Sequence, residues 1–195
     1  MIRRRFRVAV VFAAGLLLSG CADMYEDLFG KDKPPPPCPQ VLLLANAEQI
    51  VQFQDGGGKD LTDVLYQAEL DAARAKCEYS FDDDDRPVRV ETRIVVDIFA
   101  ERGPANRSRK ASFSYFVALV DADKRTVAKS TFPVTIEFPG NRSRLLFRDS
   151  DPGVLLDIPL AEGETGRDYE AFVGFQLTPE QLEHNRQMRE RRVGG

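Results

Sequence analysis

Hydrophobic and polar residues alternate with a period of two along the segment VRVETRIVVDIFAE, residues 88–101. A period of two places alternate side chains on opposite faces of a β-strand. We therefore expect a strand with one buried face and one wet face. The expected buried face consists of Val88, Val90, Thr92, Ile94, Val96, Ile98 and Ala100. The expected wet face consists of Arg89, Glu91, Arg93, Asp97 and Glu101.

Shorter segments alternate in the same way up to Leu177. They are residues 112–120, 127–138, 154–160 and 169–177, and residues 41–44 and 49–53 would be the first strands. Turn-forming residues, such as Asp151-Pro152-Gly153, separate the later segments. Pro133 indicates a break, a bulge or an edge position, because proline has no N–H to donate. Short strands with frequent turns predict an all-β fold, an antiparallel immunoglobulin-like β-sandwich.

Residues 61–79 fit two kinds of secondary structure. Their apolar residues include a helical spacing, and the Ala, Glu and Lys content favours a helix. The same residues also alternate in two phases, the first ending at Ala72 and the second starting at Ala73. A single phase change is what a β-bulge produces, so we favour a strand over a helix.

A short helix is expected at the C-terminal end, in residues 178–195. Thr178 can cap it, Pro179 suits its first turn, and Gln181 completes a capping box. Only Leu182 and Met188 are large apolar residues in the stretch to about Arg191, so the helix should be mostly solvated.

The N-terminal end has the pattern of a secretory signal peptide. Arginines near the start precede an apolar stretch from Val8 to Leu18, which is shorter than the roughly 20 residues that span a bilayer. Leu18-Ser19-Gly20-Cys21 resembles a bacterial lipobox. That resemblance implies cleavage between Gly20 and Cys21 and acylation of Cys21, and Ala22, in place of Asp, implies an outer-membrane destination.

These signals divide the chain into four parts. Residues 1–20 are the expected lipoprotein signal peptide, and residues 21–37 a lipid-anchored, proline-rich tether. Residues 38–177 are the expected β-sandwich domain, and residues 178–195 the helix and tail. Loss of residues 1–20 removes four arginines and no acids, so the formal net charge of −4 becomes four units more negative. Such an acidic surface argues against nucleic-acid binding.

Two cysteines, Cys38 and Cys77, follow Cys21. An even pair in an exported protein predicts a disulfide, which would fasten the start of the domain to its body. Two free thiols are the alternative.

Candidate chemistry is sparse. Asp82, Asp83, Asp84 and Asp85 are a weak calcium candidate, weighed against an exposed turn. Gly56-Gly57-Gly58-Lys59 lacks the Ser or Thr that a phosphate loop needs. The single histidine, His184, has no nucleophile motif beside it, so we expect no catalytic residues, no cofactor and no enzyme.

The lipobox, the proline-rich tether and the strand pattern to Leu177 together resemble uncharacterised proteobacterial envelope lipoproteins with a single immunoglobulin-like β-sandwich. The resemblance implies a non-enzymatic binding or assembly module that faces the periplasm, is held by its lipid anchor and contacts an envelope protein. The alternative is a small-ligand or calcium-binding carrier or an accessory hydrolase. A deep pocket with convergent polar groups would favour the alternative, whereas a shallow patch or an unpaired edge strand would favour the binding module.

Overall fold

The computed structural model describes residues 34–193. The expected signal peptide, Cys21 and most of the tether lie outside the described residues. The elements, in chain order, are β1 (Gln40–Leu43), β2 (Gln49–Phe53), η1 (Leu61–Asp63), β3 (Val64–Phe81), β4 (Pro87–Arg102), β5 (Lys110–Val120), β6 (Thr126–Glu137), β7 (Arg144–Pro159), η2 (Gly166–Asp168), β8 (Glu170–Phe175) and α2 (Pro179–Val193).

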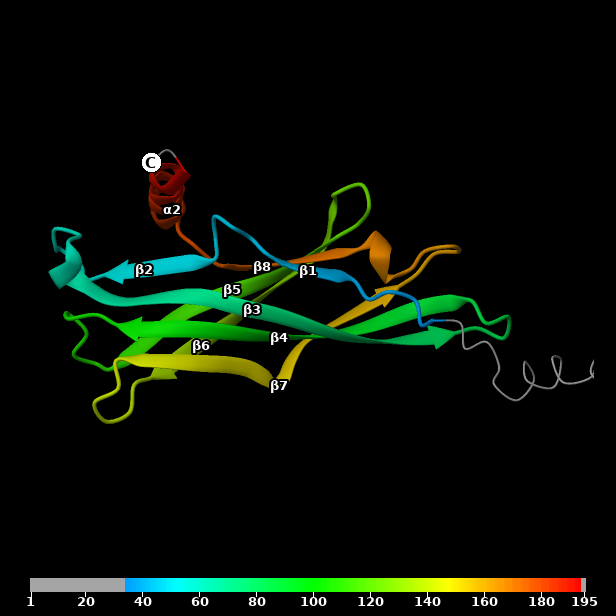
Figure 1. The fold of residues 1–195 in the computed structure, drawn as a ribbon, viewed down its shortest axis with the longest axis horizontal. Helices are drawn as coiled ribbons and strands as arrows, with labels where there is room; N and C mark the ends of the chain where they lie inside the picture. The colour runs from blue at the N-terminus through cyan, green and yellow to red at the C-terminus, as the bar shows by residue number, and fades with distance from the viewer. Residues whose placement is uncertain (1–33, 194–195) are drawn as a thin grey trace, which may run out of the picture. The chain divides into compact units, whose positions relative to one another are not determined.

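The strands form two four-stranded sheets that enclose one hydrophobic core. The first sheet has the order β1-β8-β5-β6, and the second sheet has the order β2-β3-β4-β7. All neighbours are antiparallel except β1 and β8, which are parallel. Figure 1 shows the path of the strands, and apolar side chains from both sheets form one buried cluster. The predicted all-β sandwich is confirmed at this level.

The strand prediction for residues 61–79 is confirmed by β3, which begins at Val64 after a single 3₁₀ turn. The register against β4 shifts between Leu70 and Ala72, close to the predicted change of phase. Before the shift, Tyr66, Ala68 and Leu70 point into the core, and after it the opposite parity does. The bulge thus reconciles the two phases in one strand.

Strand β7 corrects the prediction of a short strand at residues 154–160. It begins at Arg144 and pairs with β4 on both sides of an irregularity that faces Ile94 and Val96. The predicted turn at Asp151-Pro152-Gly153 lies inside this irregularity. Gly153 has φ 74°, and a Cβ there would lie 2.9 Å from the Ile94 carbonyl oxygen, so the close approach requires glycine.

The core is strongly apolar but contains tyrosines whose hydroxyls form hydrogen bonds, Tyr66 to the Ser112 carbonyl and Tyr115 to Asp149. Tyr115 of β5 is fully buried, and its hydroxyl donates to Asp149 Oδ2 of β7 at 2.7 Å. Its ring stacks on that of Phe132 in β6, with centroids 5.2 Å apart. This bond links the two sheets between β5 and β7.

The C-terminal helix is confirmed, with its predicted cap. Thr178 N–H donates to Gln181 Oε1 at 2.9 Å, and Gln181 N–H donates to Thr178 Oγ1 at 3.2 Å. No helix among residues 34–193 has both the length and the apolar character needed to cross a membrane.

Candidate binding surface on the second sheet

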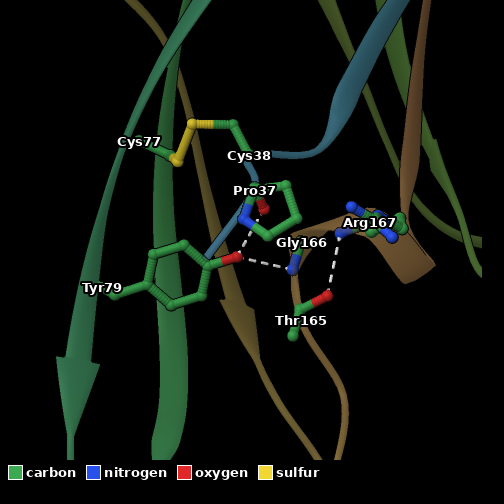
Figure 2. Close-up of a disulfide and its surroundings, with 7 residues drawn as sticks. All are labelled: Pro37, Cys38, Cys77, Tyr79, Thr165, Gly166 and Arg167. Carbon is green, nitrogen blue, oxygen red and sulfur yellow. Dashed lines mark hydrogen bonds between the residues drawn. A yellow bond between two sulfur atoms is a disulfide. The ribbon is translucent and has the colours of Figure 1, made fainter. Parts of the chain in front are cut away.

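The predicted disulfide is present and fixes the start of the domain. Cys38 and Cys77 are bonded, with their Cα atoms 5.7 Å apart, and Cys77 belongs to β3 (Figure 2). Tyr79, two residues further along β3, donates its hydroxyl to the Pro37 carbonyl at 2.7 Å and accepts from Gly166 N–H at 2.6 Å. The chain that follows the prolines is therefore held to the second sheet and to the loop before β8.

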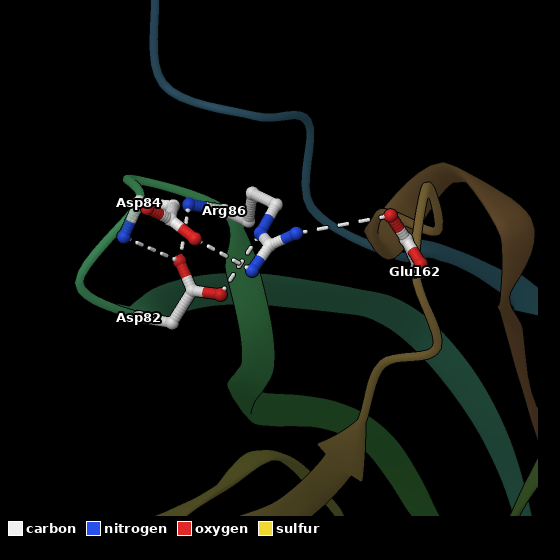
Figure 3. A network of polar contacts seen from close by, with 4 residues as sticks. All are labelled: Asp82, Asp84, Arg86 and Glu162. Atoms are coloured by element: carbon white, nitrogen blue, oxygen red, sulfur yellow. Dashed lines mark hydrogen bonds and ion pairs between the residues drawn. The ribbon is translucent and has the colours of Figure 1, made fainter.

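The acidic loop between β3 and β4 is closed by an arginine of its own. Arg86 pairs with Asp82 at 3.0 Å and with Asp84 at 2.8 Å, and its guanidinium also lies 3.8 Å from Glu162 (Figure 3). Backbone N–H groups of Arg86 and Asp84 donate to Asp82, and these bonds hold the pKa of Asp82 below its usual value. The Arg86 guanidinium thus pairs with two of the four carboxylates that were the calcium candidate. Among residues 34–193, no group of three or more His, Cys, Asp or Glu side chains could hold a metal ion.

The glycine run and the histidine line the same groove. Residues 56–59 form the turn after β2, and Lys59 forms an ion pair with Glu180 at the start of α2. His184 of α2 packs edge-on against Phe53, with ring centroids 6.4 Å apart. An open groove of about 540 Å³ separates α2 from the loop after β2.

Strand β2 is one of the two outer strands of the second sheet, and α2 partly covers its free edge (Figure 1). The Glu48 carbonyl accepts from Leu70 N–H of β3, so the next residue, Gln49, turns its backbone carbonyl away from β3. Asn185 of α2 donates to that Gln49 carbonyl at 2.7 Å and to the Asn46 carbonyl at 3.1 Å. The Asn185 amide thus binds backbone carbonyls with which the N–H groups of another strand would pair.

The outer strands β6 and β7 are also protected against edge pairing. Phe138 N–H donates to the carbonyl of Arg109, the residue before β5, so the backbone N–H and C=O groups of the even-numbered residues of β6 point to β5. The backbone of Pro133 therefore lies toward the free edge. Of the three alternatives predicted for Pro133, the structure shows the edge position, and the missing N–H weakens this edge as a template. The irregularity at Gly153 interrupts the edge of β7, which also hinders pairing with another strand.

The outer face of the second sheet, which is the face turned away from the core, carries a shallow depression of about 270 Å³. Two cross-strand rows of side chains form most of its lining. The first row is Gln49, Glu69 and Phe99, and Leu146 continues it on β7. The second row is Val51, Gln67, Glu101 and Arg144.

Phe99 is the aromatic residue in the lining of this depression. Its side chain is 37% exposed although it lies among polar groups on the wet face of β4. The Arg144 guanidinium lies 5.9 Å from its ring centroid. Arg144 also donates to Glu101 Oε2 at 2.8 and 2.9 Å, and Gln67 donates to the same oxygen at 3.1 Å. The bond from Arg144 lowers the pKa of Glu101, so the pair stays ionised at neutral pH.

Next to the depression, Asp97 corrects the prediction of a wet face along the whole of β4. Asp97 is only 1% exposed, because Arg148 of β7 and Arg74 of β3 fold over it. The nearest N···O distance is 2.6 Å in both pairs. Hydrogen bonding by Arg148 is the main cause that lowers the pKa of Asp97, and its charge and that of Arg74 add to the effect.

Two further cations continue this cluster along the same face. Arg93 of β4 is opposite Lys76 of β3, and Leu155 of β7 lies on its other side. Arg93 donates to the Pro152 carbonyl at 3.1 Å. Among residues 34–193, neither Lys76 nor Arg93 has a carboxylate within 4.0 Å. We call Arg74, Lys76, Arg93 and Arg148 the cationic cluster.

Sequence reasoning missed this surface for a local reason. Period-two alternation placed Arg93, Asp97 and Glu101 on one face correctly. Phe99 lies on that same face, and the alternation gives no reason for an apolar residue there. The partners Arg144 and Arg148 were missed because the first half of β7 was not predicted as a strand. An aromatic residue within a charged face was the signal that could have located the depression.

Comparisons with known protein families, with curated proteins and with solved structures found no match for this chain.

Proposed function

We propose that this protein is a non-enzymatic binding module, anchored by lipid at Cys21 in the bacterial cell envelope and facing the periplasm. Its contact surface is the outer face of the second sheet, from the depression at Phe99 to the cationic cluster. Ala22 after Cys21 favours the outer membrane over the inner membrane as the place of the anchor.

The observation that carries this proposal is the bond between Cys38 and Cys77. It accounts for the two cysteines that follow Cys21, which leaves the lipobox cysteine for acylation. A structural disulfide also suits an oxidising compartment such as the periplasm. Because the bond lies directly after the prolines, it fastens the tether to the body of the domain.

The choice of surface follows from the character of the outer strands β2, β6 and β7. The edges of β2, β6 and β7 are covered, interrupted or lack a donor, which disfavours a partner strand there. The outer face of the second sheet has an exposed aromatic ring and cations that keep free N–H groups. Surface features of this kind suit contact with a ligand better than an unbroken polar sheet does.

We also propose that the fold is immunoglobulin-like. An immunoglobulin-like relationship is supported by two packed sheets whose strands are mainly antiparallel. The strand orders, β1-β8-β5-β6 and β2-β3-β4-β7, differ from the ABED and CFG sheets of constant domains. The relationship we propose is therefore one of architecture.

Site-specific cross-linking in living cells tests the contact surface. A photoreactive residue replaces Leu146, which is 53% exposed beside Phe99, and a control places the same residue at the exposed Thr131 on the outer face of the first sheet. We expect slower-migrating adducts from position 146 and not from position 131. Equal adducts from both positions, or adducts from position 131 alone, would overturn the choice of surface.

A further inference from the structure

We infer that the outer face of the second sheet binds an anionic glycan, a chain of sugar rings that carry carboxylate groups. One ring packs on Phe99 in the depression, and a carboxylate further along the chain binds the cationic cluster. The inference rests on the proposed function for the surface and the compartment, and it adds the chemistry of the ligand.

The size and openness of the depression favour one unit of a longer ligand. Its volume of about 270 Å³ lies just below the ~300–1,000 Å³ of pockets that enclose drug-sized ligands. It lies on a sheet face, so a chain that places one ring there can continue over the neighbouring strands. A compact ligand would leave most of its own surface in water at such a site.

The lining has the chemistry that a sugar ring requires. The face of Phe99 offers an apolar surface to the C–H groups of a pyranose. Around it, Gln49 and Gln67 present amides that both donate and accept, and Glu101 and Arg144 present planar groups in adjacent positions. Groups of this kind match the neighbouring hydroxyls of a sugar. Their bonds to each other hold Gln67, Glu101 and Arg144 in place before a ligand arrives.

The cationic cluster adds selectivity for negative charge. Arg74 and Arg148 share the single carboxylate of Asp97, so their guanidinium groups keep further N–H donors for a ligand. Arg93 and Lys76 have no carboxylate partner among the described residues within 4.0 Å. On a protein that is acidic as a whole, a local excess of cations creates an attractive field for an anion.

An acidic row limits the cluster at its far side. Glu91 of β4 is opposite Glu78 of β3 and Asp157 of β7. Asp157 is paired with Arg89, whereas Glu78 and Glu91 are like charges that repel each other and a bound anion. A ligand carboxylate is therefore confined between Phe99 and this row. At ~3.3 Å per strand residue, Phe99 and Arg93 are about 20 Å apart, a span that a chain of rings covers and a single small anion does not.

Co-sedimentation with peptidoglycan sacculi tests the inference, because sacculi are an insoluble glycan whose attached peptides place carboxylates along the chain of sugar rings. The full chain, purified in detergent, is mixed with native sacculi and with sacculi whose carboxylates have been converted to neutral methylamides. We expect binding to native sacculi and at least about tenfold weaker binding to the amidated ones, the loss that a charge-assisted hydrogen bond predicts. Equal binding to both preparations would overturn the anionic part of the inference.

Matched variants locate the binding on the sheet. Arg93→Gln and Phe99→Ala should each weaken binding about tenfold, whereas Lys129→Gln, which removes one cation from the outer face of the first sheet, should leave it unchanged. Phe99→Leu keeps an apolar side chain without the aromatic face and serves if Phe99→Ala lowers the melting temperature. Equal affinity of Arg93→Gln and Lys129→Gln would overturn the inference.

The outcomes separate this inference from the proposed function. If sacculi do not bind and the adduct from position 146 contains a protein, the ligand is not a glycan but the contact surface stands. If sacculi do not bind and position 146 gives no adduct, both the inference and the choice of surface fail.

Discussion

Removal of the Cys38–Cys77 disulfide should destabilise the domain strongly. The bond closes a loop between residues that are 39 positions apart. In the chain-entropy model, a loop of that length constrains the unfolded chain by about 4 kcal/mol. For a domain of this size, about 2–4 °C of melting temperature corresponds to 1 kcal/mol, so the expected decrease is roughly 8–16 °C.

The assay is urea unfolding of the double variant Cys38→Ser/Cys77→Ser beside the unmodified chain. Cys21→Ser is the matched control, because it removes a cysteine without opening the loop, and its unfolding midpoint should not move. The hydrogen bonds of Tyr79 to Pro37 and Gly166 remain in the double variant, so β1 should stay docked at low temperature. A loss of less than about 1 kcal/mol would refute the reasoning that this bond fastens the start of the domain.

Three other substitutions test separate parts of the structure. Asp97→Asn should lower the free energy of unfolding by about 1–2 kcal/mol. The loss is limited because the arginine partners of Asp97 are more than half exposed and solvent offsets part of it. Because the pKa of Asp97 is lowered in the folded state, its contribution is complete above about pH 4 and is lost as the pH falls through the lower folded value. In urea unfolding, the difference in free energy of unfolding between the two proteins should therefore narrow towards about pH 2. A difference that does not depend on pH would contradict this account. Asn185→Ala uncovers the Gln49 carbonyl at the edge of β2 and should increase self-association in light scattering; an unchanged molar mass at high concentration would count against the edge argument. Tyr115→Phe removes the bond to Asp149 and should cost about 1.5–3 kcal/mol in urea unfolding, and a cost below about 0.5 kcal/mol would show that this bond contributes little.

Alternation of apolar and polar residues was sufficient to predict most strands and the bulge of β3. It worked because one face of each strand is buried, so a bulge appears as a change of phase at Ala72 and Ala73. The capping box at Thr178 was predicted from residue types at a fixed spacing, and the disulfide from an even pair of cysteines in a chain with an export signal.

Features that depend on strand pairing were not predictable in this way. The Asp151-Pro152-Gly153 segment has the composition of a turn, yet β4 continues past it and holds both halves of β7 in one strand. The burial of Asp97 depends on Arg74 and Arg148, which are brought beside it only by the register of three strands. The depression at Phe99 depends on four strands, so no single segment reveals it.

The state of Cys21 tests the central claim of a lipid-anchored envelope module most directly. Mass spectrometry of the N-terminal peptide, from protein isolated from cell membranes, measures that state. The account predicts a chain that begins at Cys21 and carries acyl groups on its sulfur and its amino group. A peptide that begins at Met1, with Cys21 unmodified, would contradict it.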